Sequence, residues 1–386
     1  MTGAPHIYLV AAERSGDLLG GALMQSLRER CPDVRFSGVG GRAMSEQGIV
    51  SAIDISGLGI LGWIDGIKAY SRVKRDVAAT VADILEARPD AVVLIDSWGF
   101  TLRVAQGVRE ADPSIKLVKY VGPQVFATRP GRAATLAGTV DHLLSIMSFD
   151  APYYEQHGLP VTFVGNPTLE RLPDGDGPAF RARHGIAADA EVLVLLFGSR
   201  PSEIKRMFTA FTRAVERLRA ERPDLAIVIP IADPVDEMLR NRLATESVFE
   251  GCVLVDETEK ADAFAAATVS LACSGTVVME LATAGVPTVT AYRLGWITWA
   301  LIRGFKLFKA RFITIVNMVA DEELVEEYVQ TRATGANLAA AVIRMLDDPQ
   351  RRDTLRRRMI EATGELRGEG RASEKAAQAV LETLDG

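Results

Sequence analysis

The chain has 386 residues, of which 48% are hydrophobic and 24% charged, and its formal net charge is −6. This composition excludes a disordered or fibrous protein, and the acidic balance argues against a nucleic-acid binder. Because single hydrophobic cores stop growing at about 250–300 residues, the length predicts two domains.

The cysteines and the N-terminus indicate a reducing compartment. The three cysteines are far apart, which predicts neither a disulfide framework nor a zinc site. The first residues lack the basic start and the cleavage site of a signal peptide, so we expect a cytoplasmic protein. No stretch reaches the roughly 18 apolar residues of a spanning helix, so we expect any membrane contact to be peripheral.

In the first half of the chain, apolar runs of strand length alternate with amphipathic stretches of helical spacing. This alternation predicts βαβ units around a parallel sheet that is covered on both faces. The expected strands are residues 7–11, 35–39, 91–95, 116–121 and 142–147, and the clearest expected helices are residues 18–30 and 70–87.

A cluster of Pro, Gly and Asp at residues 169–185 predicts a linker, after which the alternation resumes. The tail from about residue 335 has helical spacing, and we expect its helices to close the second domain. The expected strands of the second half are residues 191–197, 226–232, 251–255, 267–273 and 286–292. We therefore predict an α/β protein with two Rossmann-like domains facing a cleft, the architecture called GT-B in nucleotide-sugar enzymes, with domains at 1–172 and 173–386.

The turn after the strand at 267–273 predicts a phosphate site. Ser274 begins this turn, and the N–H groups of Gly275 and Thr276 are expected at a helix N-terminus, where a diphosphate is favoured. Glu280 lies about one and a half turns further on and could reach the ribose hydroxyls. The alternative is that Ser274 caps the helix and that Glu280 is solvated.

A second strand ends in Gly198, Ser199 and Arg200. Glycine allows close approach of the backbone, and the arginine guanidinium is suited to phosphate oxygens. Parallel strands present their carboxyl ends at one edge of the sheet, so we expect both turns to share one ligand. The alternative is an ordinary turn with a surface arginine.

Acidic residues follow two strands of the first half. The first strand runs into Glu13, Ser15 and Asp17. Ser15 or Asp17 could cap the next helix, whereas Glu13 either caps it or points into the interdomain cleft. Asp96 ends the strand at 91–95, where a carboxylate could take a proton from an acceptor hydroxyl. Spacing alone favours the alternative, in which Asp96 caps the following helix.

Taken in order, the segments AAERSGD, GVGGRAM, LIDSWGF, YVGPQVFATR, FVGNP, FGSR and SGTVVMELATAGVP resemble the lipid-A-disaccharide synthase family from end to end. That family consists of GT-B glycosyltransferases that join UDP-2,3-diacylglucosamine to 2,3-diacylglucosamine 1-phosphate, releasing UDP and forming a β-1,6-linked disaccharide. The resemblance implies an inverting transfer, a UDP-sugar donor, a lipid acceptor and no cofactor.

The resemblance also assigns roles to individual residues. It implies a catalytic role for Asp96 and Glu13, and donor binding by Gly198, Ser199, Arg200, Ser274, Gly275, Thr276 and Glu280. The residues that it implies for acceptor binding are Ser15, Asp17, Arg129 and Asn317.

The chain departs from the family mainly in its first half. Ala12 replaces a glycine, Gly99 and Thr101 replace an aspartate and an asparagine, and Asn166 replaces a histidine. Both tryptophans of the family's PSVWAWR are also lost. These departures leave two alternatives open: a divergent paralogue with another lipid acceptor, and a non-catalytic UDP-sugar or lipid-binding protein. Other nucleotide-sugar enzymes, such as UDP-N-acetylglucosamine 2-epimerases, share the phosphate-binding turn and the glutamate.

A basic and aromatic stretch with no acidic residue lies between Glu280 and Asp321. Such a composition is typical of an interfacial helix on anionic lipid, which predicts a peripheral location on the inner face of the cytoplasmic membrane. The alternative is a buried helix with a basic edge. The residues expected to contact the membrane are Trp296, Trp299, Arg303, Lys306 and Lys309.

The sequence predicts no metal site. The DGD at 174–176 lies in the predicted linker among turn residues, and the four histidines have no ligand spacing. The sequence does not fix the oligomeric state, and an oligomer is allowed.

Overall fold

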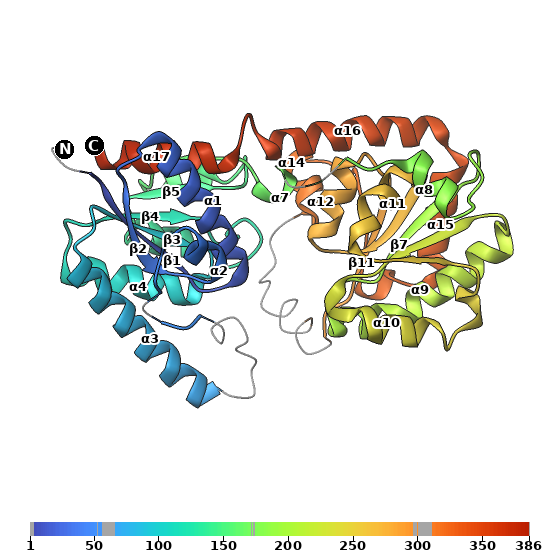
Figure 1. Ribbon diagram of the computed structural model, residues 1–386. Helices are drawn as coiled ribbons and strands as arrows, with labels where there is room; N and C mark the ends of the chain where they lie inside the picture. The colour runs from blue at the N-terminus through green and yellow to red at the C-terminus, as the bar shows by residue number, and fades with distance from the viewer. Residues whose placement is uncertain are drawn as a thin grey trace. The chain divides into compact units, whose positions relative to one another are not determined.

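The computed structural model describes residues 4–51, 53–55, 66–170, 172, 174–295, 299 and 311–385. The chain forms two compact units (Figure 1). Unit 1 comprises Met1–Glu170 and Leu366–Gly386, and unit 2 comprises Arg171–Glu365. Among the described residues, each unit contains a six-stranded parallel sheet, which confirms the predicted fold class of two Rossmann-like domains.

The sheet of unit 1 has the strand order β2-β1-β3-β4-β5-β6. Its strands are β1 (His6–Ala11), β2 (Arg35–Val39), β3 (Ala91–Ile95), β4 (Lys116–Tyr120), β5 (His142–Ser145) and β6 (Val161–Phe163). Its helices are α1 (Arg14–Arg30), α2 (Arg42–Glu46), α3 (Gly66–Ala87), α4 (Trp98–Ala111), α5 (Gly131–Ala137), α6 (Ala151–Glu155), α7 (Pro167–Glu170) and α17 (Ala372–Asp385). The expected strands are confirmed to within two residues. β6 was not predicted, because a three-residue edge strand is too short to show a periodicity.

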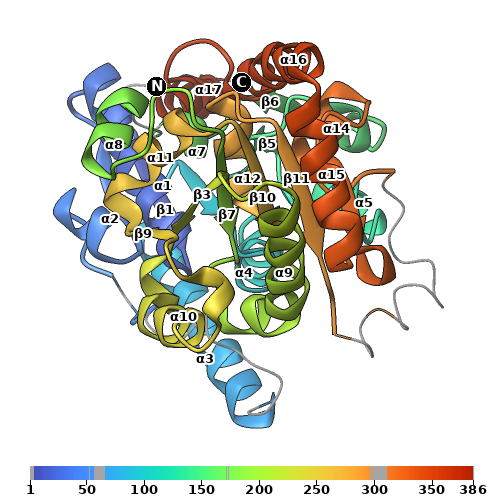
Figure 2. The ribbon, with the colours of Figure 1, turned by 90° about the vertical axis from the view of Figure 1, so that its right-hand side faces the viewer.

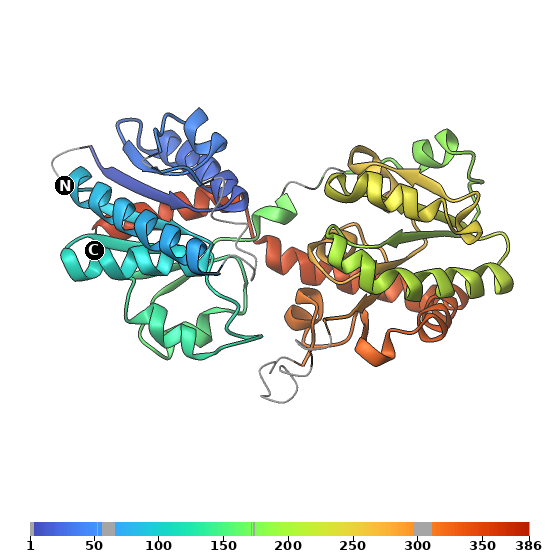
Figure 3. The same cartoon turned by 90° about the horizontal axis from the view of Figure 1, so that it is seen from below.

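Side chains of β1 alternate between the two faces of this sheet, as a pleated strand requires. Ile7 and Leu9 belong to the core that includes residues of α1 and α17, whereas Tyr8 and Val10 belong to the core on the side of α3 and α4. Figure 3 shows α3 and α4 side by side. Both faces are therefore covered by helices.

The sheet of unit 2 has the strand order β12-β11-β10-β7-β8-β9. Its strands are β7 (Val192–Leu196), β8 (Ala226–Pro230), β9 (Val253–Val255), β10 (Val269–Cys273), β11 (Thr288–Tyr292) and β12 (Glu326–Val329). Its α-helices are α8 (Gly177–Arg183), α9 (Pro201–Glu221), α10 (Asp236–Leu243), α11 (Lys260–Ala266), α12 (Thr276–Thr283), α14 (Ile315–Ala320), α15 (Gly335–Asp347) and, for most of its length, α16 (Pro349–Arg367). Short 3-10 helices lie at Asp233–Val235, Ser247–Phe249, Glu257–Glu259 and Gln330–Arg332. Here too the expected strands are confirmed to within two residues, and the edge strand β12 was not predicted.

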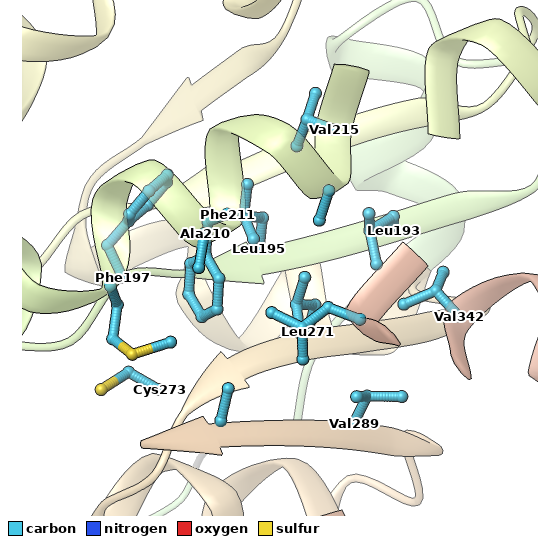
Figure 4. Close-up of a cluster of buried hydrophobic side chains, with 14 of the residues drawn as sticks. Leu193, Leu195, Phe197, Ala210, Phe211, Val215, Leu271, Cys273, Val289 and Val342 are labelled. Atoms are coloured by element: carbon cyan, nitrogen blue, oxygen red, sulfur yellow. The ribbon is translucent and has the colours of Figure 1, made fainter. Parts of the chain in front are cut away.

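The core of unit 2 lies between the sheet and the helices α9 and α15, which pack against each other (Figure 2). Leu195 on β7 and Leu271 on β10 are fully buried against Phe211 of α9 and Val342 of α15 (Figure 4). The helices α11 and α12 contact strands β7 and β10 as well. This packing fixes the carboxyl ends of β7 and β10, from which the predicted donor residues project.

Two details of the domain boundary differ from expectation. The predicted linker at 169–185 contains the helix α8, whose first turn is capped by Asp176 accepting a hydrogen bond from Ala179 N at 2.9 Å. We expected all closing helices in the domain 173–386, but α17 belongs to unit 1. Its buried residues Ala376 and Val380 share a core with α1, so the chain returns to the first sheet at its end.

Candidate active site

A pocket of about 250 Å³ lies at the carboxyl ends of the neighbouring strands β7 and β10 in unit 2. Its volume is close to the lower end of the roughly 300–1,000 Å³ that ligand pockets span. Every residue expected to hold the donor lines it: Gly198, Ser199, Arg200, Ser274, Gly275, Thr276 and Glu280. The two turns therefore line one pocket within a single unit, whereas their sharing of one ligand stays a prediction.

The turn after β10 leaves a helix N-terminus open. Gly275 is the N-cap of α12, and no side chain caps the helix. Ser274 is not the cap, and its N–H donates to Ala291 O at 3.0 Å. A Cβ added to Gly275 would meet nothing within 4 Å. The first N–H groups of a helix have no intrahelical acceptor, so this turn can receive an anion.

The turn after β7 requires its glycine. Gly198 has φ +102°, and a Cβ there would lie 2.6 Å from Glu203 Oε2. That oxygen accepts hydrogen bonds from Ser199 N at 3.2 Å and Arg200 N at 3.3 Å. The Arg200 side chain is 75% exposed, so its guanidinium remains accessible to a ligand although it also pairs with Glu203. Sequence analysis missed Glu203, although an acidic residue three positions after an N-cap is a known helix-start signal.

Glu280 is paired within the pocket. Lys260 Nζ lies 2.9 Å from Glu280 Oε2 and 3.5 Å from Glu257 Oε1, and all three residues line the pocket. The Glu280 side chain is only 13% exposed, which differs from the solvated alternative. Sequence analysis missed Lys260 and Glu257, because they follow a different strand, β9, and no local motif marks them.

In unit 1, the end of β3 has a strained backbone. Asp96 and Ser97 have φ +49° and +41°, a left-handed conformation that costs a residue other than glycine about 1–3 kcal/mol. The N-cap of α4 is Ser97, and no side chain caps this helix. Asp96 therefore does not cap the helix, and the alternative that spacing favoured is not observed. Such strain persists where the surrounding structure holds it, and it is common at functional sites.

Three of the predicted residues meet at the ends of the neighbouring strands β1 and β3. Ser15 Oγ donates to Asp96 Oδ2 at 3.4 Å, and Ser97 Oγ donates to Glu13 Oε1 at 3.1 Å. Glu13 occupies the N-cap position of α1 but makes no capping bond. The structure thus gathers two carboxylates and two hydroxyls at one edge of the sheet.

Asp17 has a structural role that the resemblance did not indicate. It is 5% exposed, and its carboxylate accepts hydrogen bonds from Gly41 N at 2.8 Å, Ala43 N at 2.9 Å and Met44 N at 3.0 Å. Asp17 and Glu13 both line a second pocket, of about 730 Å³, in unit 1. The carboxylate of Asp17 is therefore engaged in holding the wall of that pocket.

The other two residues implied for acceptor binding lie elsewhere. Asn317 is fully buried in unit 2; its Nδ2 donates to Val325 O at 2.8 Å and Glu327 Oε1 at 2.9 Å, and its Oδ1 accepts from Val325 N at 2.8 Å. This corrects the expectation that Asn317 contacts the acceptor directly, because its side-chain amide is already hydrogen-bonded to Val325 and Glu327. Arg129 is exposed with φ +51° in the turn before α5, and between these described residues no bond joins it to Asp96.

Lys119 is a buried charged group that sequence analysis missed. It lies in the interior of β4, is 3% exposed, and donates to the Asp96 carbonyl and to Thr101 Oγ1. Burial lowers the pKa of Lys119 to about 7, while the nearby Asp96 acts in the opposite direction. A lysine inside an apolar strand run was the available signal, because lysine is rarely fully buried without a partner.

The structure gives no view of most of the predicted membrane contact. Four of the predicted residues lie outside the described part of the chain: Trp296, Arg303, Lys306 and Lys309. For Trp299, the structure shows the backbone N–H donating to Gly295 O at 2.9 Å. None of the helices that the structure describes is long and apolar enough to cross a membrane. Over the same residues, no group of three or more His, Cys, Asp or Glu side chains could hold a metal ion.

Two parallel-sheet units, with a pocket at the strand ends of one of them, define the GT-B class of fold. Solved structures share it: an S. aureus protein titled "MnaA-UDP co-structure" has a TM-score of 0.66 at 14% identity, covering 99% of this chain and 97% of that one. A UDP-GlcNAc 2-epimerase from Neisseria meningitidis, titled as bound to UDP-GlcNAc, has a TM-score of 0.64 at 11% identity, covering 98% and 100%. At these identities the likeness concerns the fold alone.

The sequence comparisons are more specific. The family model described as lipid-A-disaccharide synthetase matches residues 7–382. A lipid-A-disaccharide synthase from Rhodospirillum centenum is 42% identical over 385 residues, covering 98% of this chain and 94% of the relative. Another from Ruegeria pomeroyi is 39% identical over 393 residues, covering 98% and 96%. The chain belongs to the lipid-A-disaccharide synthetase family of glycosyltransferases, as the resemblance implied.

Proposed function

We propose that this protein is a lipid-A-disaccharide synthase that transfers a 2,3-diacylglucosamine unit from UDP to a 2,3-diacylglucosamine 1-phosphate acceptor. The observation that carries the proposal is the pocket of unit 2, where all the donor residues expected from sequence line one cavity. The titles of two structures with the same fold name UDP or UDP-GlcNAc as ligand, which supports a UDP-sugar donor.

The donor half of the reaction uses unit 2. The diphosphate binds at the open N-terminus of α12, where Gly275 and Thr276 present backbone groups, and the exposed guanidinium of Arg200 supplies charge. Glu280 accepts hydrogen bonds from the ribose hydroxyls, and Lys260, whose Nζ lies 2.9 Å from Glu280 Oε2, orients the carboxylate. These contacts stabilise UDP as the leaving group.

The acceptor half uses the strand ends of unit 1. The acceptor hydroxyl attacks the anomeric carbon, its proton passes to the Asp96 carboxylate, and the bond from carbon to the UDP oxygen breaks with its electron pair on UDP. Attack opposite the leaving group inverts the configuration. Glu13, bonded to Ser97, orients the turn that carries Asp96. Leu18 and Ile55 lie beside Glu13 in the pocket of about 730 Å³, which suits an acceptor with acyl chains.

A UDP-release assay tests the proposal. UDP should be released only when UDP-2,3-diacylglucosamine and the diacylated acceptor are both present. Asp96→Asn should lower turnover by about 10²–10⁴-fold, the usual contribution of a general base, while UDP affinity stays unchanged. Full activity of Asp96→Asn would remove the residue from the mechanism. Epimerisation of UDP-N-acetylglucosamine without any acceptor would instead indicate the 2-epimerase alternative.

Peripheral membrane binding is the second part of the proposal. Its support is the run between Glu280 and Asp321, which contains basic and aromatic residues and no acidic one. Of its basic residues, Arg293 donates to Ala333 O at 2.6 Å and Arg311 lies 3.6 Å from Asp321 Oδ1, so these two are engaged within unit 2. The proposal therefore rests on the residues between them.

Vesicle sedimentation tests the membrane contact. Replacing Arg303, Lys306 and Lys309 by Glu should release the protein from anionic vesicles, because each basic residue near such a surface contributes about 1 kcal/mol. High salt should have the same effect on the unmodified protein. The matched control replaces the exposed Arg213, Arg217 and Arg357 by Glu, which should leave binding intact. Equal binding of the two triple variants would contradict the assignment.

A further inference from the structure

The buried Lys119 of β4 contacts the backbone of Asp96, the proposed base. Lys119 and Leu117 project from the same face of β4, toward the core that α4 covers. Its Nζ donates to the backbone carbonyl of Asp96 and, at 2.8 Å, to Thr101 Oγ1. Asp96 directly follows β3 and Thr101 lies in the first turn of α4, so the lysine contacts the strand end and the start of the helix together.

That segment has a conformation that needs external support. Asp96 and Ser97 are two consecutive residues with positive φ, +49° and +41°, and neither is glycine. Asp96 N donates to Tyr120 O at 2.9 Å, which ties the turn to the end of β4. Thr101 Oγ1 lies 2.8 Å from Asp96 O and 3.1 Å from Ser97 O. Without these bonds, relaxation to negative φ would be favoured.

Lys119 takes part in the hydrogen bonds that hold this turn. The Thr101 hydroxyl has one hydrogen, so it can satisfy only one of the two turn carbonyls at a time. Ser97 O also accepts the backbone N–H groups of Phe100 and Thr101, both at 3.1 Å. The Asp96 carbonyl, by contrast, accepts from the side chains of Lys119 and Thr101, and Lys119 donates to the threonine oxygen as well. The lysine therefore completes the set of bonds that holds the turn.

We propose that Lys119 is a positioning residue for transfer: by holding the left-handed turn at Asp96 and Ser97, it aims the Asp96 carboxylate at the acceptor hydroxyl. This inference rests on the proposed role of Asp96 as the base. Lys119 itself is buried and touches no substrate, so it acts through Asp96. Because a misplacement of about 1 Å can cost about 10²-fold in rate, the effect of losing this support is large.

The test compares Lys119→Met with Lys119→Arg and with a control on the same strand, Lys116→Met, in the full-length protein. Lys119→Met should lower kcat by about 10²-fold without changing the UDP dissociation constant, because the donor pocket belongs to unit 2. Lys119→Arg, which keeps donors in place, should recover part of the activity. Lys116→Met should behave as the unmodified protein.

A double-variant cycle separates positioning from general stability. In the Asp96→Asn background, Lys119→Met should cause no further loss of kcat, because two residues that act through one carboxylate are not additive. Equal losses in both backgrounds would overturn the inference and indicate a purely structural role. If Lys119→Met does not fold, Thr101→Val takes its place in the cycle under the same criterion, because it removes the hydroxyl that contacts Lys119 and both turn carbonyls.

The outcomes also separate this inference from the proposed function. Full turnover of Asp96→Asn would remove the base and the positioning role together. A large loss in Asp96→Asn with normal turnover in Lys119→Met would leave the base in place and refute the role of the lysine alone.

Discussion

Replacing Asp17 by alanine is expected to destabilise unit 1 around the N-terminus of α2, whose N-cap is Gly41, without directly removing a substrate contact. The carboxylate accepts three backbone hydrogen bonds of 2.8 to 3.0 Å from Gly41, Ala43 and Met44. Hydrogen bonds to a charged group contribute roughly 1.5–3 kcal/mol each. Water can enter the vacated space and solvate part of what is lost, so we expect a net cost of about 3–5 kcal/mol.

Hydrogen exchange of single amides is the suitable measurement, because a chain with two units need not unfold in one step. The amides of Gly41, Ala43 and Met44 should lose about 10²–10³-fold of protection in Asp17→Ala, since about 1.4 kcal/mol corresponds to tenfold. Asp17→Asn keeps one acceptor oxygen, so the protection of these amides should lie between that of the unmodified protein and that of Asp17→Ala. Asp33→Ala, a change of an exposed residue after α1, is the matched control.

Two results would refute this reasoning. The first is unchanged protection of the three amides in Asp17→Ala, which would mean that the hydrogen bonds do not hold the N-terminus of α2. The second is an increase in the acceptor KM in a variant whose stability is intact. That combination would restore the direct acceptor contact that the family resemblance implied for Asp17.

Three further predictions concern the donor pocket and a buried acid. Glu280→Ala and Arg200→Ala should each weaken UDP binding by about 10–100-fold in calorimetry, since a hydrogen bond to a charged group contributes roughly 1.5–3 kcal/mol. The control Lys205→Ala should leave UDP binding unchanged, and so should EDTA. A loss of UDP binding in EDTA that magnesium restores would contradict the metal-free site. Gly198→Val should lower both Tm and UDP affinity, because φ is +102° and the new Cβ would lie 2.6 Å from Glu203 Oε2; an unaltered Tm would show that the turn relaxes without cost. Burial raises the pKa of Asp150 from 3.8 to about 6, so the folded state binds the proton more tightly and stability should fall as pH rises through that window. Asp150→Asn should abolish this slope, worth roughly 3 kcal/mol, in urea unfolding at pH 4 and pH 7; a slope that persists would assign it to another group.

The sequence by itself determined the fold class, ten of the twelve strands that the structure describes, and the two small-residue turns that line the pocket of unit 2. These features are local: an apolar run bounded by turn residues forms a buried strand wherever its partners lie, and a small-residue turn before a helix leaves N–H groups free. Gly198 illustrates this, because its positive φ follows from the turn alone. The carboxyl-end rule for parallel strands then brought the two donor turns to one edge of the sheet.

The roles of the buried polar residues were decided only by the tertiary structure. Asp17 and Asn317 match residues of the family's motifs, yet their partners, the N-terminus of α2 and the segment at Val325, make them supports of the fold. Lys119 and Lys260 belong to no motif, and each contacts a carboxylate-bearing residue of another segment, Asp96 or Glu280. The helix α17 has an apolar stripe that any sheet could bury, and contacts with α1 select the first one. The type of a side chain and its position in a motif indicate what it can bind, whereas the partner that it contacts depends on the long-range packing of the chain.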